Sequence, residues 1–145
     1  MERDKTLLNY VSACKVVEFQ ATVQRDNLYS FDLSELCDFK PISRIYYLYN
    51  VDATAIRGSH AHYNLKQLIV AASGSFVIEL FDGENKRQIT MDSKNKALIV
   101  VPGIWRELSS FSNDAVCLVL ASHNYLEKDY IRDLDEFKQY RNVAR

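Results

Sequence analysis

Arg57-Gly58-Ser59-His60-Ala61-His62 is the stretch that decides the fold class and locates the candidate site. Two of the three histidines of the chain stand in it, two positions apart. On an extended strand, residues two apart point to the same face, so both imidazoles share one surface while Ala61 points away. Packing alone rarely places two ionisable groups side by side, so the pair indicates a functional surface.

Short strand-like segments surround this stretch. Each is rich in aromatic or β-branched residues, and turn residues separate them at short intervals. The expected strands cover residues 43–51, 67–72, 75–81, 87–91, 97–101 and 115–122, with further strands near 14–19 and 27–33. Many short strands at this spacing predict an antiparallel sandwich or barrel, so the expected fold class is all-β.

The end of the chain follows a different period. Tyr130, Leu134, Phe137 and Arg141 recur at helical spacing, with charged residues between them. We therefore expect a C-terminal amphipathic α-helix over about residues 127–142, laid on the barrel as a lid over its core.

Length and composition limit the class of protein. The 145 residues, 48% of them hydrophobic, suit one domain over residues 1–145. The 18 basic and 19 acidic residues nearly cancel, which argues against nucleic acid or a membrane as a partner. The charged start, Met1-Glu2-Arg3-Asp4-Lys5, and the absence of a long apolar run predict a cytoplasmic protein. Cys14, Cys37 and Cys117 lack paired spacing and are expected to be free thiols.

Two sets of residues form a pattern around the histidines: Gly58, His60, His62, Gln67 and Gly74, and then Val101-Pro102-Gly103-Ile104-Trp105-Arg106. The first set resembles the first motif of the cupins, which consists of Gly, His-x-His, a later Glu and a closing Gly. The second set resembles the second cupin motif. The resemblance implies a double-stranded β-helix, or jelly roll.

The metal ligands of the cupins are incomplete in this chain. Metal-binding members use the two His and the Glu of the first motif and a His of the second. Here Gln67 stands at the Glu position, and Trp105 or Arg106 at the position of the last His. Two imidazoles and a neutral amide hold a first-row metal poorly. We therefore expect neither metal nor cofactor, and histidines that are free for proton transfer.

A longer series of motifs runs from about residue 40 to the end of the chain. It consists of Arg44-Ile45-Tyr46-Tyr47, residues 57–62, Leu65-Lys66-Gln67, Asp82-Gly83, Trp105-Arg106-Glu107, residues 114–122 and Asp129-Tyr130-Ile131-Arg132. In these segments the chain resembles the WxcM-like sugar isomerases, which are dTDP-4-dehydro-6-deoxyglucose 3,4-ketoisomerases of the same cupin fold. The chain departs from the usual pattern at residues 23–28, at Phe39-Lys40-Pro41 and at Tyr63, where a Lys is usual.

The resemblance implies a homodimer, with N-terminal strands exchanged or shared, that acts on a dTDP-linked 4-keto-6-deoxyhexose. The enzyme would move the carbonyl from C4 to C3 through an enediolate. Its product would feed an aminotransferase that makes 3-amino-3,6-dideoxy sugars for surface polysaccharides or glycosylated metabolites.

Such a reaction needs a base, an acid and a group that holds the oxyanion. His62 is the expected base and proton carrier, with His60 beside it, or the two in reverse order. Tyr46 or Tyr47 would supply a phenol, and only one of them faces the barrel because consecutive strand residues face opposite ways. The expected substrate-binding residues are Arg44 and Arg57 for the diphosphate, Trp105 for stacking on thymine or sugar, and Gln67 and Arg106.

Two alternatives remain at this point. A nucleotide-sugar 3,5-epimerase would use the same barrel, but such enzymes pair their histidine with a distant Asp and a Tyr, for which the sequence shows no clear counterpart. A non-catalytic sugar-binding cupin would need hydrogen bonds but no titrating bases, and His60 and His62 argue against it.

Overall fold

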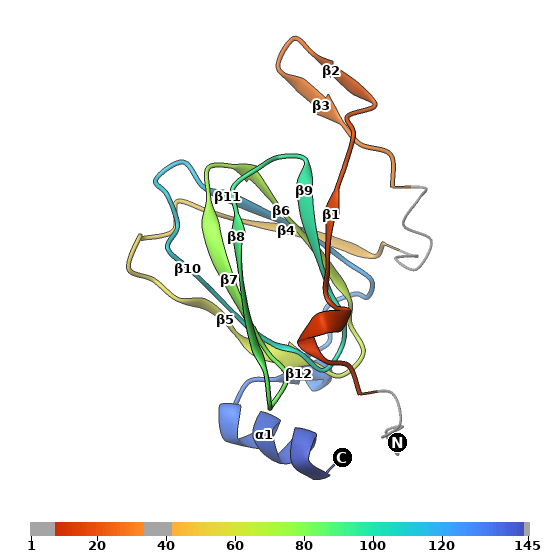
Figure 1. Ribbon diagram of the computed structural model, residues 1–145, viewed down its shortest axis with the longest axis vertical. Coiled ribbons are helices and arrows are strands. Elements are labelled where there is room, and N and C mark those ends of the chain that lie inside the picture. The colour runs from red at the N-terminus through yellow and green to blue at the C-terminus, as the bar shows by residue number, and fades with distance from the viewer. Residues whose placement is uncertain (1–7, 34–41, 144–145) are drawn as a thin grey trace.

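The computed structural model describes residues 8–33 and 42–143, and two five-stranded antiparallel sheets that face one another form its body (Figure 1). A C-terminal helix closes one end. The expected all-β jelly roll with a C-terminal α-helix is confirmed. Met1–Lys5, Cys37 and the segment Phe39-Lys40-Pro41 lie outside the described residues.

The first sheet supplies one wall of the barrel. Its strands, in spatial order, are β1 (Lys15–Glu18), β9 (Lys96–Val100), β6 (Gln67–Ser73), β11 (Val116–Ala121) and β4 (Arg44–Tyr49). Edge strand β4 alternates half-buried and exposed residues, as expected for a strand with one face on the core.

The second sheet supplies the opposite wall. Its strands, in spatial order, are β12 (Tyr130–Ile131), β5 (Arg57–His62), β10 (Trp105–Ser109), β7 (Phe76–Phe81) and β8 (Lys86–Met91). Buried side chains of both sheets, among them Ile69 and Val119 from the first and Phe76 and Ile78 from the second, form one core between them. Removing this apolar surface from water stabilises the two-sheet arrangement.

The N-terminal segment contains more elements than the sequence pattern predicted, and they are shorter. After a short 3-10 helix, η2 (Val11–Ala13), and β1, the strands β2 (Val23–Arg25) and β3 (Leu28–Ser30) form a hairpin that extends away from the two sheets (Figure 1). Asp26 and Asn27 both have positive φ, as a two-residue hairpin turn requires. The expected strand over residues 27–33 is therefore shorter and pairs only with β2.

The C-terminal α-helix begins later than the expected range of residues 127–142. A 3-10 turn, η3 (Glu127–Asp129), and strand β12 precede the helix α1 (Leu134–Val143). Asp133 sets this start, because its Oδ1 accepts a hydrogen bond from the Glu136 N–H at 2.9 Å, as an N-cap residue does. Tyr130 therefore belongs to a strand, although it matched the helical period.

Helix α1 packs against the outer face of the second sheet at the end of the barrel that it closes (Figure 1). Phe137 is fully buried, and its ring lies 5.7 Å from that of Trp105 and 5.9 Å from that of Phe81. Ala61 belongs to the same cluster, so it points away from the barrel interior as expected. Within the described ranges, no helix has the length and apolarity needed to cross a membrane.

Candidate active site

A pocket of about 360 Å³ opens between the two sheets and receives side chains from both. The residues that line it are Arg44, Tyr46, Leu48, Arg57, Gly58, His60, Gln67, Ile69, Arg106, Leu108, Cys117, Val119, Tyr130 and Arg132. Four of them are arginines, and none of the lining residues in the described part of the chain is a carboxylate. The pocket therefore favours an anionic ligand.

A distortion of β5 sets the position of the histidines. Gly58 has φ +82°, and a Cβ at this position would lie 3.1 Å from the carbonyl oxygen of Arg106. Ser59 also has a positive φ, and the β5–β10 register shifts between Arg106 and Glu107. Glycine is required here because the backbone of β10 approaches closely and the conformation is left-handed. Beyond the distortion, His60 pairs with Arg106 across the sheet.

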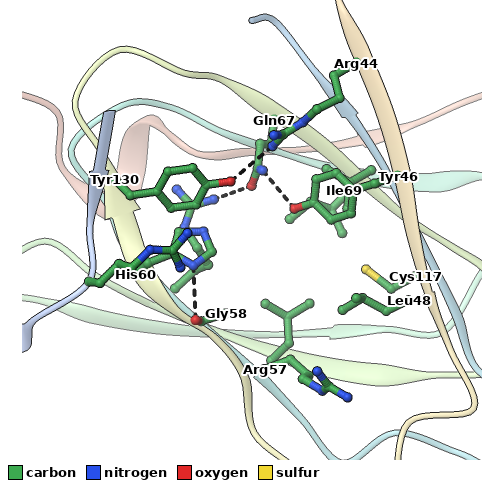
Figure 2. A pocket seen from close by; sticks show the side chains of 14 residues that line it. Arg44, Tyr46, Leu48, Arg57, Gly58, His60, Gln67, Ile69, Cys117 and Tyr130 are labelled. Atoms are coloured by element: carbon green, nitrogen blue, oxygen red, sulfur yellow. Dashed lines mark hydrogen bonds between the residues drawn. The ribbon is translucent and has the colours of Figure 1, made fainter. Parts of the chain in front are cut away.

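His60 and His62 share one face of β5, as predicted from their spacing. Their ring centroids are 4.8 Å apart, and both rings contact Tyr130, at 5.0 Å and 4.3 Å respectively. His60 lines the pocket, and Figure 2 shows it beside Tyr130 on one wall. His62 is fully buried behind these two side chains.

Asp129 is a site residue that the sequence analysis missed. Its Oδ2 lies 3.3 Å from Nδ1 of His62, while the carboxylate accepts the backbone N–H groups of Asn64 and Leu65 at 2.8 and 3.1 Å. Burial opposes ionisation of Asp129, but the hydrogen bonds from His62 and the backbone outweigh it and lower its pKa. The sequence showed no clear counterpart for the Asp and Tyr that 3,5-epimerases pair with their histidine, whereas in the structure Asp129 and Tyr130 both contact His62.

Both imidazoles are neutral near neutral pH. Burial lowers the pKa of His60 to about 3 and that of His62 to about 4, and the charge of Arg106 adds to both effects. Asp129 acts in the opposite direction on His62, because its carboxylate favours the charged imidazole. Nδ1 of His60 lies 3.1 Å from the Gly58 carbonyl oxygen, which can only accept. We therefore assign the proton of each ring to Nδ1, which leaves the lone pair on Nε2.

Tyr46, Gln67 and Arg106 form a hydrogen-bonded chain along the other side of the pocket. Gln67 Nε2 donates to the Tyr46 hydroxyl at 2.9 Å, and Arg106 donates to Gln67 Oε1 (Figure 2). All three line the pocket. Tyr47 points to the other face of β4 and is 59% exposed, so of the two tyrosines considered only Tyr46 faces the pocket.

The remaining expected residues divide into two groups. Arg44 and Arg57 line the pocket, as does Arg132, for which the sequence predicted no role. Trp105 does not, because it lies under α1 on the outer face of the sheet and donates its Nε1–H to Glu107 at 3.3 Å. In the structure, Trp105 therefore lies outside this pocket.

The chain matches known proteins over most of its length. The sequence model of the family described as WxcM-like, C-terminal matches residues 12–142. The TDP-4-oxo-6-deoxy-alpha-D-glucose-3,4-oxoisomerase of Aneurinibacillus thermoaerophilus is 39% identical over 127 residues, which cover 87% of this chain and 91% of that protein.

Solved structures agree with the sequence match. A 3,4-ketoisomerase from Helicobacter canadensis superposes with a TM-score of 0.81 at 40% identity, covering 90% of this chain and 98% of that one. A histidine-to-asparagine mutant of the 3,4-ketoisomerase QdtA from Thermoanaerobacterium thermosaccharolyticum, in complex with TDP-4-keto-6-deoxyglucose, superposes with a TM-score of 0.84 at 27% identity, covering 92% and 97%.

Proposed function

The chain belongs to the WxcM-like, C-terminal family, and from this premise we propose that it is an isomerase that converts TDP-4-keto-6-deoxyglucose into a TDP-3-keto-6-deoxyhexose. The observation that carries the proposal is a pair of neutral histidines in contact, with His60 lining an arginine-rich pocket and His62 buried directly behind it. Such a site accepts an anionic nucleotide sugar and provides nitrogen lone pairs for moving a proton.

The reaction moves one carbon-bound proton and one hydroxyl proton. A base removes the hydrogen from C3, the electrons of the C3–H bond form a C3–C4 double bond, and the electrons of the C4 carbonyl move onto its oxygen. A proton then adds to C4, and the proton of the C3 hydroxyl passes to the C4 oxygen, so that the carbonyl ends at C3 and a hydroxyl at C4. The reaction therefore requires a base and a group that stabilises the oxyanion. It requires no external oxidant or reductant, because the sugar is only isomerised.

His62 is the proposed base. The adjacent carboxylate of Asp129 stabilises the imidazolium that forms when His62 takes a proton, and it holds the proton already on the ring at Nδ1. Consistent with this role, the contact with Asp129 raises the pKa of His62 and opposes the effect of burial. His60 lies against both His62 and the pocket, and we assign it to the transfer between the C3 hydroxyl and the C4 oxygen.

Tyr46 and Arg106 are the proposed groups that stabilise the enediolate. The Tyr46 hydroxyl is a neutral donor, because burial raises its pKa even though the charge of Arg106 opposes this. Arg106 is fully buried and supplies a fixed positive charge beside the histidines. Charge that develops on a sugar oxygen is stabilised strongly by such preorganised groups in a dry pocket.

Arg44, Arg57 and Arg132 are the proposed diphosphate-binding residues. All three line the pocket, and Arg57 and Arg132 are exposed to solvent. A planar guanidinium can donate two hydrogen bonds to one phosphate, so three of them suit a diphosphate better than lysines would.

We also propose that the reaction needs no metal. Gln67 is a neutral amide at the position where metal-binding cupins carry a carboxylate, and the Arg106 guanidinium beside it repels a cation. Within residues 8–33 and 42–143, no group of three His, Cys, Asp or Glu side chains is arranged to hold a metal ion.

A homodimer is the proposed assembly. The outer face of β4 carries three large exposed side chains, Ile45, Tyr47 and Tyr49, each about 60% accessible. An edge strand with such a face can pair with a second copy of the chain. The β2–β3 hairpin extends away from the body, as expected of an element shared between subunits (Figure 1).

A cytoplasmic location is proposed as well, supported by the buried free thiols of Cys14 and Cys117, which suit a reducing compartment.

A nucleotide-sugar 3,5-epimerase is the second candidate function. The contacts of Asp129 and Tyr130 with His62 favour it, since such enzymes pair a histidine with an Asp and a Tyr. Incubation of the purified protein with TDP-4-keto-6-deoxyglucose separates the two activities. A 3-keto sugar supports the isomerase, inversion at C3 and C5 with the ketone still at C4 supports the epimerase, and binding without either change supports a sugar-binding cupin.

A further inference from the structure

We propose that Gln67 is a positioning residue whose amide directs the proton of the Tyr46 hydroxyl into the pocket. This inference rests on the proposed isomerase function, because it explains how Tyr46 becomes a donor to the sugar. It replaces the expected role of Gln67 as a direct contact to the substrate. The orientation of each group in the hydrogen-bonded chain follows from Arg106, at its buried end.

Arg106 determines which end of the Gln67 amide faces it. A guanidinium carries only donors, so the Gln67 atom that it contacts must be the oxygen, Oε1. Arg106 is itself held in place, since its Nε and Nη2 both donate to the Ile104 carbonyl oxygen, at 3.3 and 3.0 Å. The orientation of the amide therefore follows from the chemistry of its neighbour.

The opposite end of the amide then determines the role of Tyr46. Gln67 Nε2 can only donate, so the Tyr46 hydroxyl oxygen accepts this bond at 2.9 Å. The hydroxyl proton is not used in this contact and must point elsewhere. Because Tyr46 lines the pocket, the free direction is toward a bound ligand, where a sugar oxygen can accept the proton (Figure 2).

A carboxylate in place of the Gln67 amide would reverse this arrangement. One of its oxygens would still pair with Arg106, but the second oxygen would be an acceptor, and Tyr46 would donate its proton to it. The lone pairs of the phenol oxygen would then face the sugar and repel the charge that develops on the C4 oxygen. The amide at this position therefore leaves the phenol as a donor to the substrate.

The test compares Gln67→Glu, Tyr46→Phe and the double variant, all chelator-treated so that a metal bound by the new carboxylate does not contribute. Gln88→Glu makes the same chemical change at an exposed position of β8 and is the matched control. We expect Gln67→Glu and Tyr46→Phe each to lower kcat by roughly 10- to 100-fold with a smaller change in KM, and the double variant to be no slower than Tyr46→Phe. The control should keep wild-type turnover.

Two results would overturn the inference. Wild-type kcat in Gln67→Glu would contradict it directly. Losses that multiply in the double variant would show that Gln67 acts on the substrate without Tyr46. Thermal unfolding of each variant separates these results from a general loss of structure.

A second readout needs no turnover. In protein labelled with ¹³C at the tyrosine Cζ, the signal assigned through Tyr46→Phe reports the pKa of this phenol. We expect this pKa to rise in Gln67→Glu, because the phenol then donates to a carboxylate, and an unchanged value would contradict the inference. If the wild-type protein turned over no substrate, the proposed function alone would fail, and this measurement would still decide the orientation of Tyr46.

Discussion

Asp129 Oδ2 lies 3.3 Å from Nδ1 of His62 and joins the C-terminal segment to the strand that carries both histidines. The two residues are 67 positions apart in the chain but are brought together because β12 pairs with β5, with Tyr130 opposite His62. The same carboxylate accepts the backbone N–H groups of Asn64 and Leu65, which fix its position. The orientation of the proposed base thus depends on a residue outside the pocket.

Asp129→Asn tests this dependence. The Asn side chain keeps one oxygen that can accept both the Leu65 N–H and the Nδ1–H of His62, but it carries no negative charge to stabilise the imidazolium, and its hydrogen bond to the ring is weaker. We expect kcat to fall by about 10- to 100-fold or more, with a smaller change in KM. Kinetics of the substrate conversion and ¹⁵N NMR of the imidazole measure the two effects. Asp135→Asn, an exposed substitution in α1, is the control, and an unchanged ¹⁵N spectrum in Asp129→Asn would contradict the account.

Stability should decline as the pH falls below about 6.5. The folded protein holds the pKa of His60 at about 3 and that of His62 at about 4, below the ordinary value of 6.5 expected in the unfolded chain. Between these values the unfolded state binds more protons, so the free energy of unfolding rises with pH and is lost as the pH falls toward 4. Urea unfolding over this range should show a weaker pH dependence in His62→Asn than in wild type. Equal slopes in the two proteins would contradict the burial argument.

Tyr46→Phe and Tyr47→Phe form a matched pair on β4. Tyr46 faces the pocket, whereas Tyr47 is 59% exposed on the opposite face. We expect Tyr46→Phe to lower kcat by roughly 10- to 100-fold, because it removes a donor to the oxyanion, and Tyr47→Phe to leave kcat close to wild type. Steady-state kinetics with TDP-4-keto-6-deoxyglucose compare them. Equal losses in the two variants would show that the phenol in the pocket has no particular role.

Gly58→Ala should reduce both stability and activity. The new Cβ would lie 3.1 Å from the Arg106 carbonyl oxygen, in a backbone conformation with φ +82° that L-residues rarely adopt. We expect a loss of about 1–3 kcal/mol in the free energy of unfolding and displacement of His60 from the pocket. Gly83→Ala, at φ +99° in the turn between β7 and β8, should lose stability but keep its activity. Denaturant unfolding and turnover compare the two, and full activity in Gly58→Ala at a temperature where it is folded would count against the role given to this distortion.

Tyr47→Asp tests the proposed dimer. A charge in the centre of the apolar face of β4 would have to be desolvated at an interface between two copies, so we expect the protein to become monomeric in analytical ultracentrifugation. Leu134→Asp also places a charge at an exposed apolar position, but on α1, and should leave the assembly unchanged. A wild-type protein that sediments as a monomer, or a Tyr47→Asp variant that remains a dimer, would contradict this interface.

The sequence predicted most of the barrel because its strands follow simple local rules. The sequence of β4 alternates between inward-facing and outward-facing residues, and β6 and β11 are rich in apolar and β-branched residues. Each pattern predicts a strand from the local sequence alone, without knowledge of its neighbours. The tail shows where such rules fail. Tyr130 falls on the helical period of Leu134 and Phe137, but its backbone pairs with His62, and this long-range contact outweighs local spacing.

The features of the candidate site that depend on one strand alone could be predicted from the sequence. The spacing of His60 and His62 placed both rings on one face, and alternation limited the phenol to one of two neighbouring tyrosines. Asp129 and the outward position of Trp105 were not predictable in this way, because both follow from how β12 and α1 pack on the second sheet. A single sequence carries no direct signal for contacts between distant segments.

The most direct test of the proposed mechanism is incubation of the chelator-treated protein with TDP-4-keto-6-deoxyglucose in deuterated water, followed by NMR of the sugar, with His62→Asn and His60→Asn alongside. We predict a 3-keto sugar from the wild type, no exchange at C3 and no product in His62→Asn, and slowed conversion in His60→Asn. Full exchange in His62→Asn with none in His60→Asn would assign the base to His60. An unchanged and undeuterated sugar with the wild-type protein would contradict the isomerase itself.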